Sequence, residues 1–327
     1  MKNLKSNVIT LPKVHIFFLN FNRCNEVIKS LNDFLKVNYP IERIHFTVID
    51  NNSTDGSKMK IESMFDSKLV SVVQNVKNLG STARNIGILN KSADYNFVFD
   101  DDISPTNPNI IFETVILLEN NKYFGALCFR CINYYSNQTE YSNFSEIASR
   151  KTIDNLYECM SVTGNGMCFR TTAMNGFTGY EDWMFWGGEE FPFAMKMLFN
   201  KIPIAYSEQI GIFHRRADRI ITSEKSIEIE VRNNLWTAFK FFPLPIAIYF
   251  SLHHFFRRFL LNLVRGNKEN VIASCIGIKK GLLGLNKIFS NRNTLTVSAL
   301  ARHNRWFINL FFRVRNTKKN FLEFGHP

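Results

Sequence analysis

Apolar runs and amphipathic stretches alternate along the first hundred residues of the chain. Four continuous apolar runs are rich in residues that favour β-structure, which is typical of strands buried on both faces. They cover residues 14–21, 44–50, 69–75 and 95–100. Residues 25–37 and 81–92, between these runs, carry apolar positions at helical spacing. Strands that alternate with helices predict right-handed βαβ units, and hence an α/β fold with a mainly parallel central sheet flanked by helices.

The alternation is less regular in the next hundred residues. A helix is predicted over about residues 107–121, and strand-like runs follow at 123–135 and 159–170. The polar stretch 134–151 between these runs is predicted to be a loop. A further helix is predicted from Pro192, because proline suits the first turn of a helix.

Polar clusters follow each of the four predicted N-terminal strands. In open α/β sheets, ligands bind beyond the carboxyl ends of the strands. The clusters are Asn20–Arg23, Asp50–Asp55, Asn75–Arg84 and Asp100–Asp102. Because these clusters should meet at one edge of the sheet, the sequence predicts a single site there.

Positive charge is concentrated at the end of the chain. The net charge is +12, but residues 240–327 hold 15 Lys and Arg against 2 Asp and Glu, a net charge of +13. The preceding 239 residues therefore carry a net charge of −1. We interpret residues 1–240 as a nearly neutral body and residues 241–327 as a basic, aromatic, helical extension. Such asymmetry indicates an anionic partner, for example a membrane surface, a nucleic acid or a phosphorylated ligand.

The cysteines and the N-terminus favour a cytoplasmic protein. Six cysteines are spread along 327 residues without a dense framework, which fits a reducing compartment. Cys128 and Cys131 form one C-x-x-C, but a structural zinc site would need a second pair, so we predict that both are strand residues. The first residues lack the apolar core of a signal peptide, and no apolar run approaches the roughly 20 residues of a spanning helix.

The triplet Asp100–Asp102 at the end of a buried run has three interpretations. It is a solvated turn or helix cap, a calcium loop of the helix–loop–helix type, or a site for Mg²⁺ or Mn²⁺ shared with phosphate groups. The calcium loop fails, because it requires Gly and Glu where this chain has Pro105 and Ile111. The spacing of Asp100 and Asp102 suits the third interpretation, since side chains two apart on an extended segment share a face.

Other nucleotide-binding motifs are absent from the sequence. There is no G-x-x-x-x-G-K-[ST] loop, which excludes a nucleotide hydrolase of that type. The stretch GNGMCF at 164–169 lacks the third glycine of a dinucleotide fingerprint and lies far from the first strand. A nucleotidyltransferase should carry a glycine-rich loop directly after the first strand, and NFNRCNE is not such a loop.

Six short motifs together resemble family 2 glycosyltransferases with the glycosyltransferase A fold. In order along residues 14–240 they are LNFNR, VIDNNSTDGS, NLGSTARNIGI, FVFDDD, GGEE and IFHRR. The GGEE motif and the later R-N-x-L-W are similar to those of bacterial enzymes that build surface polysaccharides. The resemblance implies that residues 1–240 are a catalytic domain that binds a nucleotide sugar, and it does not extend to the last 85 or so residues.

The resemblance also implies roles for individual residues around a nucleotide-diphosphate sugar. Asp102 and His214 would bind Mn²⁺ or Mg²⁺, and Asp50 would accept a hydrogen bond from the base. The residues implied to line the nucleotide pocket are Phe21, Asn22, Arg23, Asp50, Asn78, Gly80, Arg84, Asn85, Asp100 and Asp101. Taken alone, His214 would be interpreted as an ordinary histidine at a strand end.

The resemblance places the general base at Glu190, with Glu189 as the alternative. The family usually has Glu-Asp at this point, whereas this chain has two glutamates. A carboxylate just before a helix N-terminus is stabilised as an anion, and it can then deprotonate an acceptor hydroxyl. Both glutamates could instead be ordinary acidic residues of a first turn. Trp183 and Trp186 are predicted either to bind the acceptor sugar or to pack in the core.

The sequence therefore predicts an inverting, metal-dependent glycosyltransferase. The donor would be a UDP-, dTDP- or GDP-linked sugar, and the acceptor a saccharide or a lipid-linked saccharide of a bacterial surface polysaccharide. A helix predicted from about Pro245 is either a packing helix or an interfacial helix on anionic lipid at the inner face of the cell membrane. We expect no nucleic-acid partner. The alternatives are a nucleotidyltransferase or a non-catalytic membrane-associated protein of the same fold.

Overall fold

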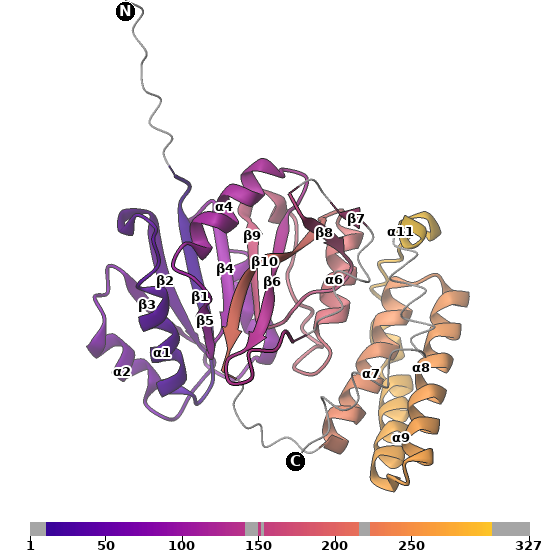
Figure 1. Ribbon diagram of the computed structural model, residues 1–327. Coiled ribbons are helices and arrows are strands. Elements are labelled where there is room, and N and C mark those ends of the chain that lie inside the picture. Colours follow the sequence, from indigo (N-terminus) through magenta and orange to yellow (C-terminus); the bar gives the residue numbers. More distant parts are fainter. Residues whose placement is uncertain (1–10, 141–149, 152–153, 216–222, 303–327) are drawn as a thin grey trace, which may run out of the picture.

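The computed structural model describes residues 11–140, 150–151, 154–215 and 223–302. A mixed sheet with helices on both faces forms the body, and a bundle of long helices lies beside it (Figure 1). The strands are β1 (Val14–Asn20), β2 (Ile44–Asp50), β3 (Val70–Gln74), β4 (Tyr95–Asp100), β5 (Ile103–Pro105), β6 (Ala126–Asn133), β7 (Arg150–Lys151), β8 (Leu156–Cys159), β9 (Gly166–Arg170) and β10 (Ile204–His214).

The helices follow the strands in the order that the sequence predicts for the first half of the chain. They are α1 (Cys24–Phe34), α2 (Ser57–Met64), α3 (Asn85–Ile88), α4 (Ile110–Asn120), α6 (Glu190–Phe199), α7 (Ser223–Phe241), α8 (Leu244–Val264), α9 (Lys268–Leu283), α10 (Leu285–Phe289) and α11 (Val297–Arg302). Short 3₁₀ turns are η1 (Ile41–Arg43), η2 (Gly80–Arg84) and η3 (Thr171–Met174). The helix predicted over 81–92 is shorter than expected, because the chain forms η2 and α3 and leaves the helix after Ile88.

The sheet is parallel in its N-terminal half and mixed beyond it. The strand order is β3-β2-β1-β4-β9-β6-β10-β8-β7, with β5 paired to β10. Strands β1 to β4 are parallel to one another, as predicted. Strand β9 then inserts antiparallel between β4 and β6, so parallel pairing returns only between β6 and β10. The α/β class with flanking helices is confirmed, although the parallel part is confined to these two groups.

The sheet separates two hydrophobic cores. Side chains of a strand alternate between its faces, so neighbouring residues of β1 enter different cores. Phe18 packs with α1, α2 and α4 on one face, and Phe17 packs with α3 and α6 on the other. Gly87 of α3 lies directly on Phe17, since a Cβ at this position would fall 2.7 Å from the Phe17 ring. The two cores fix both faces of the sheet and thereby hold its carboxyl edge rigid.

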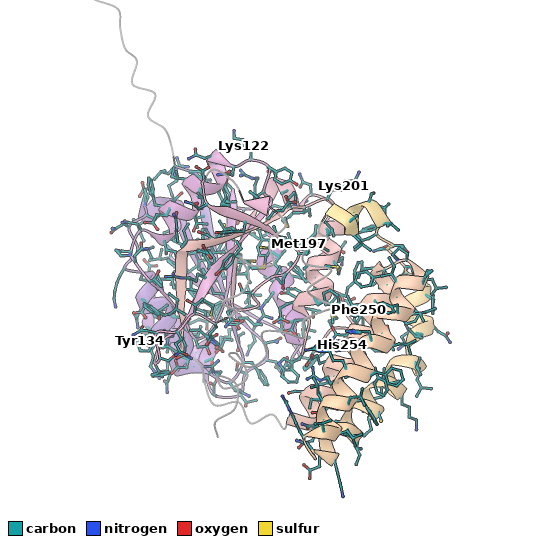
Figure 2. All side chains as sticks on the ribbon, turned by 45° about the vertical axis from the view of Figure 1, so that its right-hand side comes forward. Lys122, Tyr134, Met197, Lys201, Phe250 and His254 are labelled. Carbon is teal, nitrogen blue, oxygen red and sulfur yellow. The ribbon has the colours of Figure 1, made fainter. Side chains whose placement is uncertain are left out.

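The C-terminal helices form a bundle against the body. Helix α7 packs on both α8 and α9, and it also contacts α6 of the body. The predicted domain boundary at residue 240 falls in the last turn of α7. Phe250 and His254 lie on the inner side of α8, where they line a pocket with residues of α7 and α9 (Figure 2). No helix within the described ranges combines the length and the apolarity needed to cross a bilayer.

All six cysteines are free thiols in the described structure. Cys128 and Cys131 both lie on β6, as the sequence predicts. Burial raises the pKa of the Cys128 thiol to about 12. Cys128 is therefore a neutral, apolar core residue at physiological pH.

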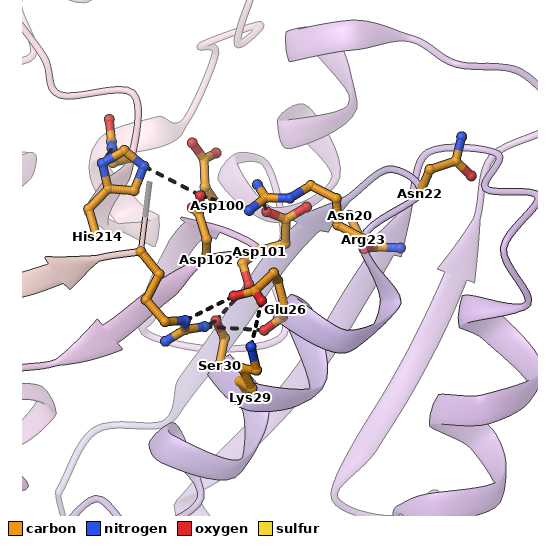
Figure 3. Close-up of polar contacts among 12 residues, drawn as sticks. Asn20, Asn22, Arg23, Glu26, Lys29, Ser30, Asp100, Asp101, Asp102 and His214 are labelled. Atoms are coloured by element: carbon orange, nitrogen blue, oxygen red, sulfur yellow. Dashed lines mark hydrogen bonds and ion pairs between the residues drawn. The ribbon is translucent and has the colours of Figure 1, made fainter. Parts of the chain in front are cut away.

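A buried arginine joins the end of β10 to helix α1. The guanidinium of Arg215 donates to the Glu26 carboxylate at 3.1 Å and to Ser30 Oγ at 2.7 Å. Its backbone N–H donates to the Asp102 carbonyl at 2.8 Å. Lys29 contacts the same Glu26 carboxylate at 2.6 Å, but its side chain is 60% exposed, against 8% for Arg215 (Figure 3).

Replacing this arginine should destabilise the fold much more than replacing the lysine. We expect Arg215→Met to lower the free energy of unfolding by about 2–4 kcal/mol, because it leaves buried polar partners without their cation. The matched variant Lys29→Met removes an exposed ion pair to the same carboxylate and should cost less than about 1 kcal/mol. Urea unfolding measures both. Equal losses for the two variants would contradict this account of Arg215.

Candidate functional site

The strand register brings the four predicted polar clusters to one edge. Asn20 pairs with Asp50, and Asp50 pairs with Gln74, across three adjacent parallel strands. On the other side of β1, Leu19 pairs with Asp100. The predicted convergence at the carboxyl ends of the strands is therefore confirmed by the pairing.

Each aspartate of the triplet at the end of β4 contacts a positive side chain. Asp100 pairs with Arg84, which is 11% exposed. Asp101 Oδ1 lies 2.5 Å from Arg23 Nη1, and Asp102 Oδ2 lies 3.0 Å from Arg23 Nη2 (Figure 3). On the far side, His214 Nε2 lies 3.4 Å from the same Asp102 oxygen. Adjacent carboxylates are thus buried because two guanidiniums and an imidazole surround them.

The electrostatics differ between neighbouring members of the triplet. Burial, with its negative neighbours, raises the pKa of Asp101 well above its usual value, although Arg23 opposes this shift. Burial also acts to raise the pKa of Asp102, but the hydrogen bond and charge of His214, together with Arg23, hold it below its usual value. Burial would lower the pKa of His214, but hydrogen bonds to Asp102, Cys131 and Glu140 raise it to about 12. Asp102 is therefore held as an anion more firmly than Asp101.

The residues present fit a hard divalent cation. Three buried polar atoms in this region have no hydrogen-bond partner among the described residues: Asp102 Oδ1, Asn20 Oδ1 and Arg84 Nε. An unpartnered buried oxygen is costly unless a ligand satisfies it. Asp102 is 2% exposed, and it offers carboxylate oxygen beside the imidazole Nε2 of His214. Carboxylate with imidazole is a donor set that Mn²⁺ accepts, and Mg²⁺ takes carboxylate with phosphate oxygens.

Glu140 is a residue of this region that the sequence does not indicate. Its Oε2 lies 2.8 Å from His214 Nδ1 and 3.4 Å from Cys131 Sγ. These three side chains could themselves hold a metal ion. Since burial raises the pKa of Cys131 to about 11, we interpret the group as a hydrogen-bond network that orients His214. Glu140 lies in a stretch predicted to be a loop, and no spacing in the sequence relates it to His214.

The predicted base-pocket residues surround the ends of β1 and β2. Phe21 is 43% exposed, and Asn22 adopts a left-handed backbone with φ 53°. Asp50 is fully buried, and its oxygens accept hydrogen bonds from Asn20, Ser53 and Gln74. The carboxylate of Asp50 is therefore engaged by protein groups, and its contact with a base stays a prediction.

Three of the residues implied to bind the nucleotide shape turns in this structure. Asn78 Oδ1 accepts from Asn51 Nδ2 and from the Gly80 N–H, both at 2.8 Å. Asn85 holds the Tyr180 backbone through both of its side-chain atoms. Gly80 has φ 58°, and a Cβ there would fall 1.9 Å from the Phe185 carbonyl oxygen. These contacts lock the 80–85 segment against the loop that precedes α6.

Arg84 connects the aspartate triplet to the two glutamates. It pairs with Asp100, and its Nη1 lies 4.0 Å from Glu189 Oε1. Glu189 also accepts from Ser81 Oγ at 2.7 Å. Glu190 is the first residue of α6, and within the described ranges its carboxylate has no hydrogen bond to another residue, although its own backbone N–H lowers its pKa slightly. Glu189 is therefore held in place, whereas Glu190 has the free carboxylate.

Burial and the neighbouring Glu189 raise the pKa of Glu190 to about 8. This value is higher than expected for a carboxylate at a helix N-terminus, because desolvation outweighs the helix dipole. Gly164 faces the Glu190 carboxylate, and a Cβ there would fall 2.6 Å from its Oε1. A pKa near the working pH suits a group that must both accept and release a proton.

The two candidate acceptor tryptophans lie in the loop before α6 and are partly buried. Trp183 packs edge-on against Trp236 of α7, with ring centroids 5.4 Å apart. The carbonyl of Trp186 accepts from Asn233 of α7. Phe185 between them is 51% exposed. Their role in acceptor binding stays a prediction.

The comparisons with known proteins agree with this arrangement. The model of the family described as glycosyl transferase family 2 matches residues 16–178. No curated protein matches the sequence at a significant level. Among solved structures, S. aureus TarS has a TM-score of 0.53 at 18% identity, with 69% of this chain and 39% of TarS covered.

Two further structures carry ligands of the kind that the site fits. GalNAc-T7 with UDP, GalNAc and Mn²⁺ has a TM-score of 0.57 at 14% identity, with 71% of this chain and 49% of that protein covered. The Pyrobaculum calidifontis mannosyltransferase PcManGT, in complex with GDP-Man and Mn²⁺, has a TM-score of 0.54 at 13% identity, with 94% of this chain and 89% of PcManGT covered.

These identities show the fold alone, and the chain spans only 39% of TarS and 49% of GalNAc-T7. The family match rests on the sequence, and it includes the ends of β1 to β4 with the aspartate triplet. Residues 16–178 therefore belong to glycosyl transferase family 2, and the chain carries the domain of a transferase enzyme on the glycosyltransferase A fold.

Proposed function

We propose that this enzyme transfers a sugar from a nucleotide-diphosphate sugar to a hydroxyl acceptor, with inversion at the anomeric carbon. The observation that carries the proposal is Asp102, a buried carboxylate with one oxygen unpartnered and the other beside His214. Arg84 contacts Asp100 of this triplet and Glu189, the residue next to Glu190. The site thus combines a place for metal and diphosphate with a base.

The chain's own groups account for one displacement. Glu190 accepts the proton of the acceptor hydroxyl while that oxygen bonds to the anomeric carbon. The bond from this carbon to the diphosphate oxygen breaks, and the nucleoside diphosphate leaves with the electron pair. Asp102 would hold Mn²⁺ or Mg²⁺, together with His214 once its Nε2 has lost its proton, and the metal would neutralise charge on the leaving diphosphate. A single displacement from the opposite face inverts the configuration.

The donor is proposed to be a UDP-, dTDP- or GDP-linked sugar. GalNAc-T7 was solved with UDP and PcManGT with GDP-Man, both with Mn²⁺, on the same fold. The Phe21–Arg23 segment and Asp50 would line the base. Asp50 accepts from Gln74 at 2.9 Å and is fully buried, so a base N–H would reach it only after the side chains around it move. Asn78, Gly80, Arg84 and Asn85 would lie along the ribose and the diphosphate.

The alternatives have less support. A nucleotidyltransferase needs donors for a triphosphate, and the loop after β1 supplies Asn22 and Arg23 rather than a run of glycines. A non-catalytic protein of this fold would have no reason to keep both a buried acidic triplet and a free Glu190. We therefore favour transfer to a saccharide or lipid-linked saccharide, with Trp183 and Trp186 near the acceptor, in bacterial surface polysaccharide synthesis.

The lipid-linked acceptor is supported by the outer face of α8. Six apolar residues at every fourth position, here called the α8 stripe, are 43–85% exposed. They are Leu244, Ile248, Leu252, Phe256, Leu260 and Val264. The inner face buries Ala247, Phe250, Ser251 and Asn262. A helix that also exposes a continuous row of large apolar residues on its outer face is suited to an apolar surrounding.

We propose that the α8 stripe lies on an anionic membrane surface, peripheral to the inner face of the cell membrane. The charge favours this partner, because residues 240–327 carry a net charge of +13. Lys268 and Lys279 are exposed on α9. Arg258 of α8 is paired with Glu230.

The metal assignment predicts the behaviour of Asp102→Asn. We expect this variant to lose Mn²⁺-dependent binding of UDP, dTDP or GDP by at least about tenfold, because an amide is a poorer ligand for a hard cation. Calorimetric titration with Mn²⁺ and with EDTA measures the effect. Asp94→Asn, an exposed change just before β4, is the control. Unchanged metal-dependent affinity in Asp102→Asn would reject the assignment.

The base assignment predicts a pH profile. With water as the acceptor, kcat/KM for the nucleotide sugar should rise with pH and level off above about 8, because Glu190 must lose its proton. Glu190→Gln should lower the rate by about 10²–10⁴-fold. Glu189→Gln should shift the profile to lower pH, because Glu189 raises the pKa of Glu190. If instead Glu190→Gln stays active and Glu189→Gln is dead, the base is Glu189.

The membrane proposal predicts a difference between two pairs of substitutions. Leu252→Glu with Phe256→Glu should reduce flotation with anionic vesicles at least about tenfold. Met59→Glu with Phe112→Glu, at exposed apolar residues on α2 and α4, should leave it unchanged. High salt should weaken binding in part. Binding that ignores vesicle charge, or a dimer that the stripe variant disrupts, would show that the stripe meets something other than an anionic membrane.

A further inference from the structure

Arg23 occupies the position where the site would take a cation. It stands between β1 and α1, and its guanidinium spans two neighbouring carboxylates (Figure 3). Nη1 lies 2.5 Å from Asp101 Oδ1, and Nη2 lies 3.0 Å from Asp102 Oδ2. The family resemblance implies a place for Arg23 in the nucleotide pocket, but the structure directs it to the acidic triplet.

Arg23 and a metal ion would both be held by the carboxylate of Asp102. Asp102 Oδ2 is approached by Arg23 Nη2 at 3.0 Å and by His214 Nε2 at 3.4 Å. A metal–oxygen bond of about 2.1 Å to this carboxylate would put a divalent cation within a few ångströms of the guanidinium. Like charges at that separation repel strongly in a partly buried site. A divalent cation on the unpartnered Asp102 Oδ1 would therefore be destabilised by Arg23 on Oδ2 of the same carboxylate.

The Arg23 side chain is more exposed than that of Arg84, so it can move away from the aspartate triplet more easily. The Arg23 side chain is 25% exposed, against 11% for Arg84 and 10% for His214. Arg84 is fixed from two sides by Asp100 and Glu189. The side-chain contacts of Arg23 among the described residues are those to Asp101 and Asp102 of the triplet.

We infer that Arg23 is the resident counter-cation of the donor-free site, and that it leaves Asp102 to pair with the donor diphosphate when the metal binds. This inference rests on the proposed function of the site. Three adjacent carboxylates face two guanidiniums. If a metal ion bound to Asp102 without a nucleotide, the displaced Arg23 guanidinium would have no new anion to pair with. A nucleoside diphosphate supplies that anion, and guanidinium pairs well with phosphate oxygens.

The consequence is strong coupling between metal and nucleotide. In the protein without nucleotide, Mn²⁺ must displace Arg23 without compensation, so its affinity should be low. With nucleoside diphosphate present, the displaced guanidinium gains a partner, so each ligand should raise the affinity for the other by the same factor. Removing Arg23 should tighten Mn²⁺ binding alone and weaken the coupling.

The test measures Mn²⁺ binding by electron paramagnetic resonance, with and without UDP, dTDP or GDP. In Arg23→Met we expect the affinity for Mn²⁺ alone to rise at least about tenfold. The factor by which nucleotide improves Mn²⁺ binding should fall at least about tenfold. Arg23→Lys keeps the positive charge but loses the two-pronged guanidinium. Its affinity for Mn²⁺ alone should lie between those of the unchanged protein and Arg23→Met. Lys29→Met removes an exposed charge from the same helix and should match the unchanged protein.

A second variant distinguishes a change in metal binding from a defect in folding. Arg23→Met leaves the buried Asp101 without its cation, so Arg23→Met with Asp101→Asn removes both members of the pair. This double variant should also bind Mn²⁺ alone more tightly than the unchanged protein. Affinity for Mn²⁺ alone that stays within about twofold in both variants, or that falls, would overturn the inference.

Failure of the inference and failure of the proposed function give different results. If the function is right and the inference wrong, the unchanged protein binds Mn²⁺ with nucleotide, Asp102→Asn does not, and the Arg23 variants leave the coupling unaltered. If the function is wrong, the unchanged protein shows no metal-dependent nucleotide binding at all. The inference then fails with it.

Discussion

Three neighbouring carboxylates can be buried at the end of a strand only if positive charge is brought to them. Separate elements supply that charge here. Arg23 comes from the start of α1, Arg84 from η2 and His214 from the end of β10. Each contact joins parts of the chain that are distant in sequence. The acidic triplet is therefore part of the candidate site, and it also holds together the elements that meet at the carboxyl edge of the sheet.

The same constraint explains how the two halves of the site are linked. Arg84 contacts Asp100 on one side and approaches Glu189 on the other, so the metal end and the base end share one cation. Glu189 is held by Ser81, which leaves Glu190 as the carboxylate without a partner within the described residues. Burial of Glu190 beside Glu189 then raises its pKa towards the range in which a base can work. The charged side chains that hold this edge of the sheet together therefore also set the pKa of the candidate base.

The sequence predicts the parallel part of this fold well and the rest less well. Buried runs with β-forming residues predicted β2 and β4 to the residue, because an unbroken apolar run bounded by polar clusters is typical of a strand covered on both faces. The antiparallel insertion of β9 was not predicted, since short apolar runs do not encode their pairing. The end of α3 at Ile88 was also missed, because helical spacing continued beyond it.

The same division applies to the site. Asp100, Asp102 and His214 were predicted as members of one site, and the structure brings all three together. The contact of Glu140 with His214 was not predicted, because it depends on the chain turning back after β6, where the Glu140 N–H donates to the Cys131 carbonyl. The position of Arg23 on the triplet was also missed, since a motif shows which residue is present but not which partner it finds.

The central claim is that the buried triplet serves a metal and a leaving nucleoside diphosphate. It is tested most directly by ³¹P nuclear magnetic resonance of the unchanged enzyme with Mg²⁺ and a panel of UDP-, dTDP- and GDP-linked sugars. The account predicts metal-dependent release of a nucleoside diphosphate from at least one donor. Release of pyrophosphate or nucleoside monophosphate, or no turnover and no binding of any donor, would contradict it.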